Sequence, residues 1–409
     1  MYRPVARSAA IPSPPGATLN IPRAPCPYER VCGASPPTPC YTAKPMATTV
    51  LRRTAGQLFM VGLPRPALGR ETREFLAEHC PGGVILFKRN IRSAEQLRQL
   101  VAAIHATGAG VPPLVALDHE GGRVDRLPHP PFTHFPPMAL VGEKEDMGLA
   151  AAVGRAMGRE LRAVGIDLDF APVLDVWSNP RNRVIGDRAF GTTPRAVARL
   201  ALAFARGLAR AGVLACGKHF PGHGATVGDS HFVLPRVSRS RRELAATDLL
   251  PFARAAAAGI PALMTAHVLV PALDPRRPVT LSRRICRDLL RRRLRFRGLL
   301  FSDDLEMQAM AGRRRVGRAA VEALQAGCDM LLVCQSLAAA REAIAAVEAA
   351  LGRGTLDAEA IGASLSRIQG LRRHLTAPPA RPSFGWPAHA RLARRLAAAA
   401  PQASARAAG

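Results

Sequence analysis

Eight short apolar runs limit the possible folds of this chain more than any other feature of its sequence. Each run is four to six residues long and is preceded by a Gly, Pro or polar residue, which is typical of a buried strand. The chain therefore contains eight candidate strands with longer segments between them. The runs cover residues 58–63, 83–87, 114–117, 166–170, 213–216, 262–265, 299–302 and 330–333.

The segments between the runs carry helix signals. Ser93 and Gln96 form a capping-box pattern ahead of an apolar helical face, and Thr193-Pro194 opens a helix that Gly212 closes. Strands that alternate with helices in this way are typical of a (β/α)8 barrel. We therefore predict an α/β fold of the TIM type, with one barrel domain over residues 46–375.

The two ends of the chain differ from this pattern. Residues 1–45 are rich in Pro, Ser, Thr and Ala and show no strand or helix periodicity, so we expect a disordered extension. Met46 stands where the composition changes and is the expected initiator, in which case the extension is not translated; a transit or linker segment is the alternative. Residues 376–409 are expected to form a Pro-rich linker and a C-terminal helix.

Composition argues against several classes of partner. The net charge is +27, but only four of the 57 basic residues are Lys, and the Arg residues are spread over Ala-rich helical segments without interleaved aromatics, so we expect no nucleic acid partner. No uninterrupted apolar stretch of about 18 residues is present, so no integral membrane segment is expected. The eight Cys form no CxxC pair, which fits a reducing compartment. We expect a monomer.

Polar side chains follow the apolar runs. In a (β/α)8 barrel the chemistry collects at the C-terminal ends of the strands, and this is where these residues are predicted to lie. The ends of five runs carry Asp118-His119-Glu120, Asp169, Lys218-His219, His267 and Ser302-Asp303-Asp304.

The segment after the fifth run is the richest in candidate chemistry. His219, His223 and His231 alternate with Lys218 and Asp229 in a glycine-rich stretch that we expect to be a polar surface loop. Imidazole exchanges protons near neutral pH, so this loop is a candidate for acid/base catalysis. Its histidines have no fixed ligand spacing on one element, and no metal or other cofactor is predicted.

Four motifs in this order give the chain a family resemblance. Over residues 54–373 it resembles the bacterial β-N-acetylhexosaminidases of glycoside hydrolase family 3. The motifs are Asp118-x-Glu-Gly-Gly-Arg123, Lys218-His219-Phe-Pro-Gly-His-Gly, Asp229-Ser230-His231 and Phe301-Ser302-Asp303-Asp304-Leu305. His119 departs from the family pattern, which has Gln at this position.

The resemblance implies a retaining, two-step hydrolysis. Asp303 would be the nucleophile that forms a covalent glycosyl-enzyme, and its neighbour Asp304 would be structural or an alternative nucleophile. His231 would be the acid/base, polarised by Asp229. The sugar would be held by the side chains of Asp118, Arg188, Lys218 and His219.

The resemblance also implies a biological role. Glucosidase-type members use a second domain for the acid/base, whereas only about thirty-six residues follow residue 373 here, which fits the single-domain subgroup with a His acid/base. Such enzymes remove N-acetylglucosamine from anhydro-muropeptides during peptidoglycan recycling in the cytoplasm. Another β-glycoside as substrate, phosphorolysis, or a non-catalytic sugar-binding barrel are the alternatives.

Overall fold

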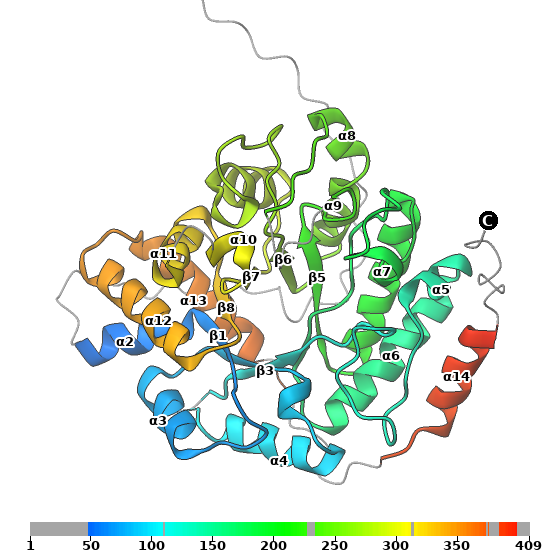
Figure 1. The fold of residues 1–409 in the computed structure, drawn as a ribbon, viewed down its shortest axis with the longest axis horizontal. Coiled ribbons are helices and arrows are strands. Elements are labelled where there is room, and N and C mark those ends of the chain that lie inside the picture. The colour runs from blue at the N-terminus through cyan, green and yellow to red at the C-terminus, as the bar shows by residue number, and fades with distance from the viewer. Residues whose placement is uncertain are drawn as a thin grey trace, which may run out of the picture.

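The strands close into an eight-stranded parallel barrel in which each strand pairs with the next and β8 pairs with β1 (Figure 1). The computed structural model describes residues 48–108, 111–226, 234–311, 315–373, 375 and 384–398. The predicted TIM-type fold is confirmed. The strands are β1 (Phe59–Gly62), β2 (Gly83–Leu86), β3 (Leu114–Leu117), β4 (Leu168–Asp169), β5 (Leu214–Phe220), β6 (Ala262–Thr265), β7 (Leu299–Asp304) and β8 (Met330–Val333).

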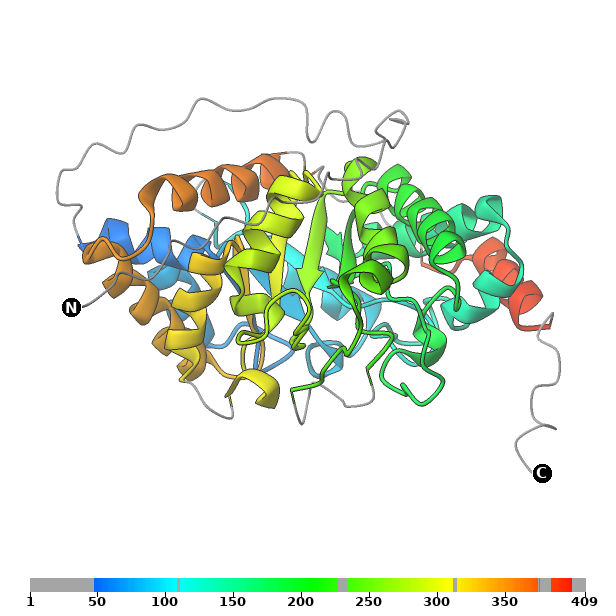
Figure 2. The same cartoon turned by 90° about the horizontal axis from the view of Figure 1, so that it is seen from above.

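The helices surround the barrel, so that the strands are covered from outside (Figure 2). The longer helices are α2 (Thr48–Gln57), α3 (Arg70–His79), α4 (Ala94–His105), α6 (Met147–Ala163), α7 (Pro194–Arg210), α9 (Leu249–Ala257), α11 (Val316–Ala326), α12 (Leu337–Gly352), α13 (Ala358–Arg373) and α14 (Pro387–Ala398). Shorter ones are α5 (Met138–Glu143), α8 (Arg241–Ala246), α10 (Gln308–Ala311), η1 (Lys88–Asn90), η2 (Gly186–Arg188), η3 (Val279–Leu281) and the wider η4 (Arg284–Arg293).

Local signals account for where several helices begin and end. The Ser93 hydroxyl accepts a hydrogen bond from the Gln96 amide at 3.1 Å and caps α4, but the Gln96 side chain accepts from Arg92 instead, so only half of the predicted capping box forms. Pro194 is the first residue of α7. Gly327 ends α11 with a φ of 114°, a left-handed conformation that favours glycine.

Strand β5 is longer than its apolar run. We predicted a strand over residues 213–216 that gives way to a surface loop, whereas β5 continues to Phe220 and buries Lys218 and His219. The strand continues because its backbone remains paired: the Leu174 amide donates to the Lys218 carbonyl at 2.6 Å, and the Lys218 amide donates to Pro172 at 3.1 Å. The prediction of a loop was therefore wrong for residues 217–220.

The last described helix, α14, lies against α5 and α6 (Figure 1). The His389 ring pairs with Glu160 of α6 at 2.8 Å, and Trp386 stacks on Phe132 with ring centroids 5.7 Å apart. Residues 1–45 and the 376–383 stretch of the predicted linker lie outside the described residues. Among the helices that the structure describes, none is both long and apolar enough to cross a membrane.

Asp329 joins the last strands of the barrel to the helices outside them. Its buried carboxylate accepts hydrogen bonds from the Leu300 amide at 2.8 Å and from Ser364 of α13 at 2.7 Å. It also pairs with Arg367 at 2.9 Å and with Arg291 of η4. One carboxylate therefore pairs with two guanidinium groups and accepts a hydrogen bond from a strand amide.

We expect Asp329→Ala to destabilise the fold by about 3–5 kcal/mol, because it leaves buried positive charge without a partner. Urea unfolding measures this loss. Asp288→Ala is the matched control, since Asp288 pairs with Arg292 on the exposed surface at 3.3 Å and is expected to contribute about 0.5 kcal/mol or less. Equal effects of the two substitutions would contradict the role given to Asp329.

Candidate active site

Lys218 lies at the mouth of the barrel between two carboxylates. Its ammonium group is 2.6 Å from Asp118, which directly follows β3, and 2.6 Å from Glu120. The Lys218 side chain is only 3% exposed. Burial alone would lower its pKa, but the two carboxylates outweigh burial and raise the pKa of Lys218. The lysine is therefore held in its charged form.

Glu120 connects this pair to Arg188 of η2. The guanidinium of Arg188 donates to both oxygens of Glu120, at 2.7 and 2.8 Å, and also to the Val184 carbonyl at 3.0 Å. Although burial opposes it, the charges of Arg188 and Lys218 hold the pKa of Glu120 well below its usual value. Glu120 belongs to the quoted motif, but its role was missed; its position two residues after Asp118 was the available signal.

Asp118 has its second oxygen 3.3 Å from the Arg126 guanidinium. Burial would raise the pKa of Asp118, but Lys218 and Arg126 outweigh this and lower it, so the carboxylate stays ionised. Three of the predicted sugar-binding residues, Asp118, Lys218 and Arg188, thus meet in one charged network through Glu120.

The fourth predicted sugar-binding residue, His219, pairs with Asp175. The Nδ1 atom of His219 is 2.7 Å from Asp175, whose other oxygen accepts from the His223 amide at 2.6 Å. Burial raises the pKa of Asp175, but His219 and the bonds from His223 lower it overall. Asp175 therefore orients both imidazole-bearing residues. Asp175 was not predicted from the sequence, because it lies in the segment after β4 and belongs to none of the four motifs.

Two glycines shape the turn after β5, for different reasons. Gly222 has a φ of 130°, which a residue with a side chain rarely adopts. Gly224 packs so closely that a Cβ atom would lie 1.8 Å from the Val176 carbonyl oxygen. The turn therefore needs both glycines to bring His223 into the buried position where its ring nitrogen is 2.9 Å from Thr226.

Asp303 and Asp304 have different environments at the end of β7. The Asp304 carboxylate accepts from the Glu306 amide at 3.1 Å and from the Cys334 amide at 3.2 Å, and His267 contacts its backbone carbonyl at 2.9 Å. Burial raises the pKa of Asp304 to about 7. Asp304 thus ties β7 to the end of β8. Among the described residues, the half-buried Asp303 carboxylate accepts a hydrogen bond from the Asp304 amide at 2.8 Å.

The charge of Asp303 also affects the pKa values of other groups in this part of the barrel. Burial is the main cause of the high pKa of the Cys334 thiol, and the charges of both Asp303 and Asp118 add to it. Burial lowers the pKa of His223, while Asp175 and Asp303 oppose that shift. Asp229 and His231 lie outside the described residues, so their position in the site stays a prediction.

Asp169 ends β4 and is fully buried. One oxygen accepts from the His119 amide at 2.9 Å, and the other has no partner among the described residues. Burial raises the pKa of Asp169 from 3.8 to about 8, although His119 opposes the shift. The folded protein therefore keeps a proton that the unfolded chain releases near pH 4. Stability from this group is complete below about pH 4 and is lost as pH rises toward 8.

We expect Asp169→Asn to remove this pH dependence, because the amide cannot ionise. The melting temperature of the variant, relative to the native protein, should rise by several degrees between pH 5 and pH 8. Differential scanning calorimetry at both pH values measures the difference. A difference that is the same at both would show that Asp169 is not protonated in the fold.

Comparison with known proteins identifies the family. Residues 50–371 match the glycosyl hydrolase family 3 N terminal domain. A Beta-hexosaminidase of Methylococcus capsulatus is 44% identical over 321 residues, which are 75% of this chain and 95% of the relative. One of Chromobacterium violaceum is 47% identical over 282 residues, covering 67% and 78%.

Solved structures agree. NagZ from Neisseria gonorrhoeae in complex with N-trifluoroacetyl-D-glucosamine superimposes with a TM-score of 0.70 at 36% identity, over 83% of this chain and 98% of that chain. A family 3 beta-N-acetylglucosaminidase from Paenibacillus superimposes with a TM-score of 0.80 at 38% identity, covering 85% and 68%. The predicted resemblance and the prediction of a glycoside hydrolase are confirmed: this chain belongs to glycosyl hydrolase family 3.

Proposed function

We propose that the protein is a β-N-acetylhexosaminidase that releases terminal N-acetylglucosamine from anhydro-muropeptides, in the cytoplasm, during peptidoglycan recycling. The observation that carries the proposal is the charged network of Asp118, Glu120, Lys218 and Arg188 at the same barrel end as Asp303. Support also comes from the curated relatives named Beta-hexosaminidase and from the NagZ neighbour, which was solved with an N-acylated glucosamine.

The network is suited to a sugar ring. Its carboxylates and cations hold one another in fixed positions and in their charged forms, so they offer preorganised acceptors and donors. Vicinal hydroxyl groups pair well with such a set, since each hydroxyl both donates and accepts. We assign Asp118, Lys218, Arg188 and His219 to the sugar on this ground, with Glu120 and Asp175 as positioning residues.

Asp303 is the proposed nucleophile. Its carboxylate attacks the anomeric carbon while the bond to the leaving oxygen breaks, and His231 gives that oxygen a proton. In the second step His231 takes a proton from water, the water oxygen attacks the anomeric carbon, and Asp303 is released as a carboxylate. Two displacements keep the β-configuration. Asp229 would fix the His231 tautomer and raise its basicity.

Asp304 is less suited to the nucleophilic role. Two backbone amides already bind its carboxylate, and burial raises its pKa to about 7, so it is a poorer anion near neutral pH. Within the described part of the chain, Asp303 accepts a bond from the Asp304 amide, and it is partly open to solvent. The contrast supports Asp303 as nucleophile and Asp304 as the residue that holds the end of β7.

The substrate assignment is tested with nitrophenyl glycosides. We expect kcat/KM for the β-N-acetylglucosaminide to exceed that for the β-glucoside by at least about 100-fold, because the N-acetyl group adds contacts that the glucoside lacks. Proton NMR should show the β-anomer as the first-formed product. Net inversion, or a preference for the glucoside, would overturn the proposal. Assays with phosphate distinguish phosphorolysis, which would release the sugar 1-phosphate.

The catalytic roles are tested with two variants. Asp303→Asn should lower kcat by at least about 1,000-fold on every substrate, because no carboxylate remains to displace the leaving group. His231→Ala should retain glycosylation by a dinitrophenyl glycoside, whose leaving group needs no proton, but should lose hydrolysis of natural disaccharides. A burst followed by a slow steady state, partly rescued by azide, is the expected time course.

His105→Asn serves as the control, since His105 pairs with Asp167 at 2.8 Å and lies in α4. Its kinetics should match those of the native protein. Near-normal hydrolysis of both activated and natural substrates by His231→Ala would remove His231 from the acid/base role, and His223 would then be the next candidate.

A further inference from the structure

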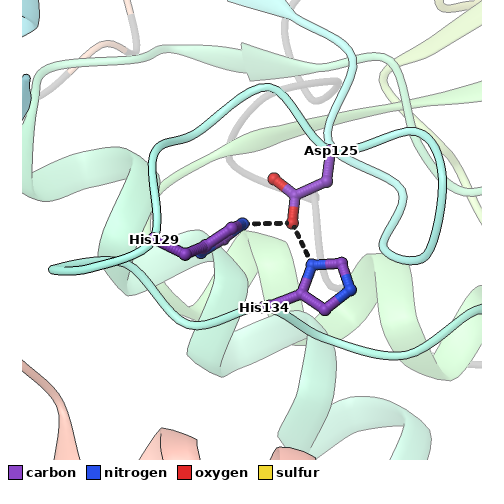
Figure 3. Close-up of side chains that lie close together, drawn as sticks. All are labelled: Asp125, His129 and His134. Atoms are coloured by element: carbon purple, nitrogen blue, oxygen red, sulfur yellow. Dashed lines mark hydrogen bonds and ion pairs between the residues drawn. The ribbon is translucent and has the colours of Figure 1, made fainter. Parts of the chain in front are cut away.

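The loop between β3 and α5 brings together Asp125, His129 and His134 (Figure 3). One oxygen of Asp125 lies 2.8 Å from Nε2 of His129 and 3.0 Å from Nδ1 of His134. One ligand atom from each residue lies within 4.8 Å of the others. The proposed hydrolysis uses none of these three side chains.

The hydrogen bonding of His129 indicates that positive charge is required between this ring and Asp125. Its Nδ1 is 2.8 Å from the Phe132 carbonyl oxygen, which can only accept, so Nδ1 carries the proton. In a neutral ring, Nε2 then presents a lone pair toward the Asp125 carboxylate oxygen. Two lone pairs at 2.8 Å repel each other unless a cation or a second proton lies between them. The same oxygen also faces His134.

The surroundings of the cluster fit a bound cation. The carbonyl that fixes the His129 tautomer is the usual outer partner of a metal-bound histidine. The second oxygen of Asp125 accepts a hydrogen bond from the Leu127 amide at 3.2 Å and lies 3.1 Å from Nδ1 of His119. The exposed fraction of the side chain is 6% for Asp125, 30% for His129 and 59% for His134. A cation can therefore reach the cluster from solvent and retain water molecules as ligands.

We propose that Asp125, His129 and His134 form a binding site for a divalent first-row transition metal ion, with water completing the coordination. Two imidazoles and one carboxylate are a ligand set that suits zinc and its neighbours. Metal–ligand bonds of about 2.0–2.2 Å place the ligand atoms of a tetrahedral site about 3.3 Å apart. The contacts of Asp125 with His129 and with His134 must therefore lengthen by only a few tenths of an ångström.

The site would brace the segment that carries Asp118, the carboxylate assigned to the sugar. Asp125 contacts the His119 ring, and the next residue, Arg126, reaches Asp118. A metal at Asp125 would therefore limit the motion of the loop that follows β3. No metal site is predicted from the sequence here, because three residues in a proline-rich loop have no defined geometry until the loop folds.

The test is zinc binding by the full chain after treatment with a chelator. Isothermal titration with Zn²⁺ near pH 7.5 should show one more equivalent bound by the native protein than by His129→Asn/His134→Asn. Cobalt absorption in the same proteins reports the coordination. His105→Asn is the matched control, because its ring also pairs with a buried carboxylate but belongs to no described cluster of three ligands. It should bind as much zinc as the native protein.

The histidines between residues 219 and 231 can also take up the probe, so the titration is repeated with His231→Ala to assign each equivalent. With zinc in hundredfold excess over Kd, the native melting temperature should rise by about 2–5 °C, and the rise should shrink in the double variant. Binding should weaken at pH 5.5, where protons compete for imidazole. Equal zinc stoichiometry in native protein and double variant would overturn the proposal and leave Asp125 as a counter-ion of the two histidines.

Discussion

The buried ammonium of Lys218 holds the functional end of this barrel together. It lies between carboxylates from the loop after β3, and one of these, Glu120, is clamped in turn by Arg188. Charges taken out of water are costly unless each is paired, so these residues depend on one another. A loss of any member would leave the remaining charges uncompensated. The same pairing keeps each group ionised and in one position, as recognition of a sugar requires.

The closed barrel supplies the rest of that geometry. Parallel strands end at the same side, so residues separated by long stretches of chain meet there, as Asp118 and Lys218 do. Adjacent residues on a strand point to opposite faces, and this divides the work at the end of β7. Asp304 is bound by the backbone of the neighbouring segment, whereas Asp303 remains partly open. Asp304 thus stabilises the end of β7, while the neighbouring Asp303 is left accessible for reaction.

The apolar runs of the sequence predicted the strands well where the buried side chains are apolar. The runs at 114–117, 262–265 and 330–333 coincide with β3, β6 and β8. They were less accurate at β5, where the strand includes Lys218 and His219. Hydrophobic patterning treats charged residues as solvent-facing, but in this barrel their charges are matched by Asp118, Glu120 and Asp175, which makes burial possible.

The sequence by itself determined the barrel and which strand ends carry chemistry, because both follow from local patterns of apolar and polar residues along the chain. It also carried the motifs that identify the family. Only the tertiary structure decided which residues pair with one another. Glu120 pairs with Arg188, Asp175 pairs with His219, and a cluster forms around Asp125. Pairings between distant segments depend on how loops fold over the barrel mouth, and on the need of each buried charge for a counter-charge, which linear spacing does not encode.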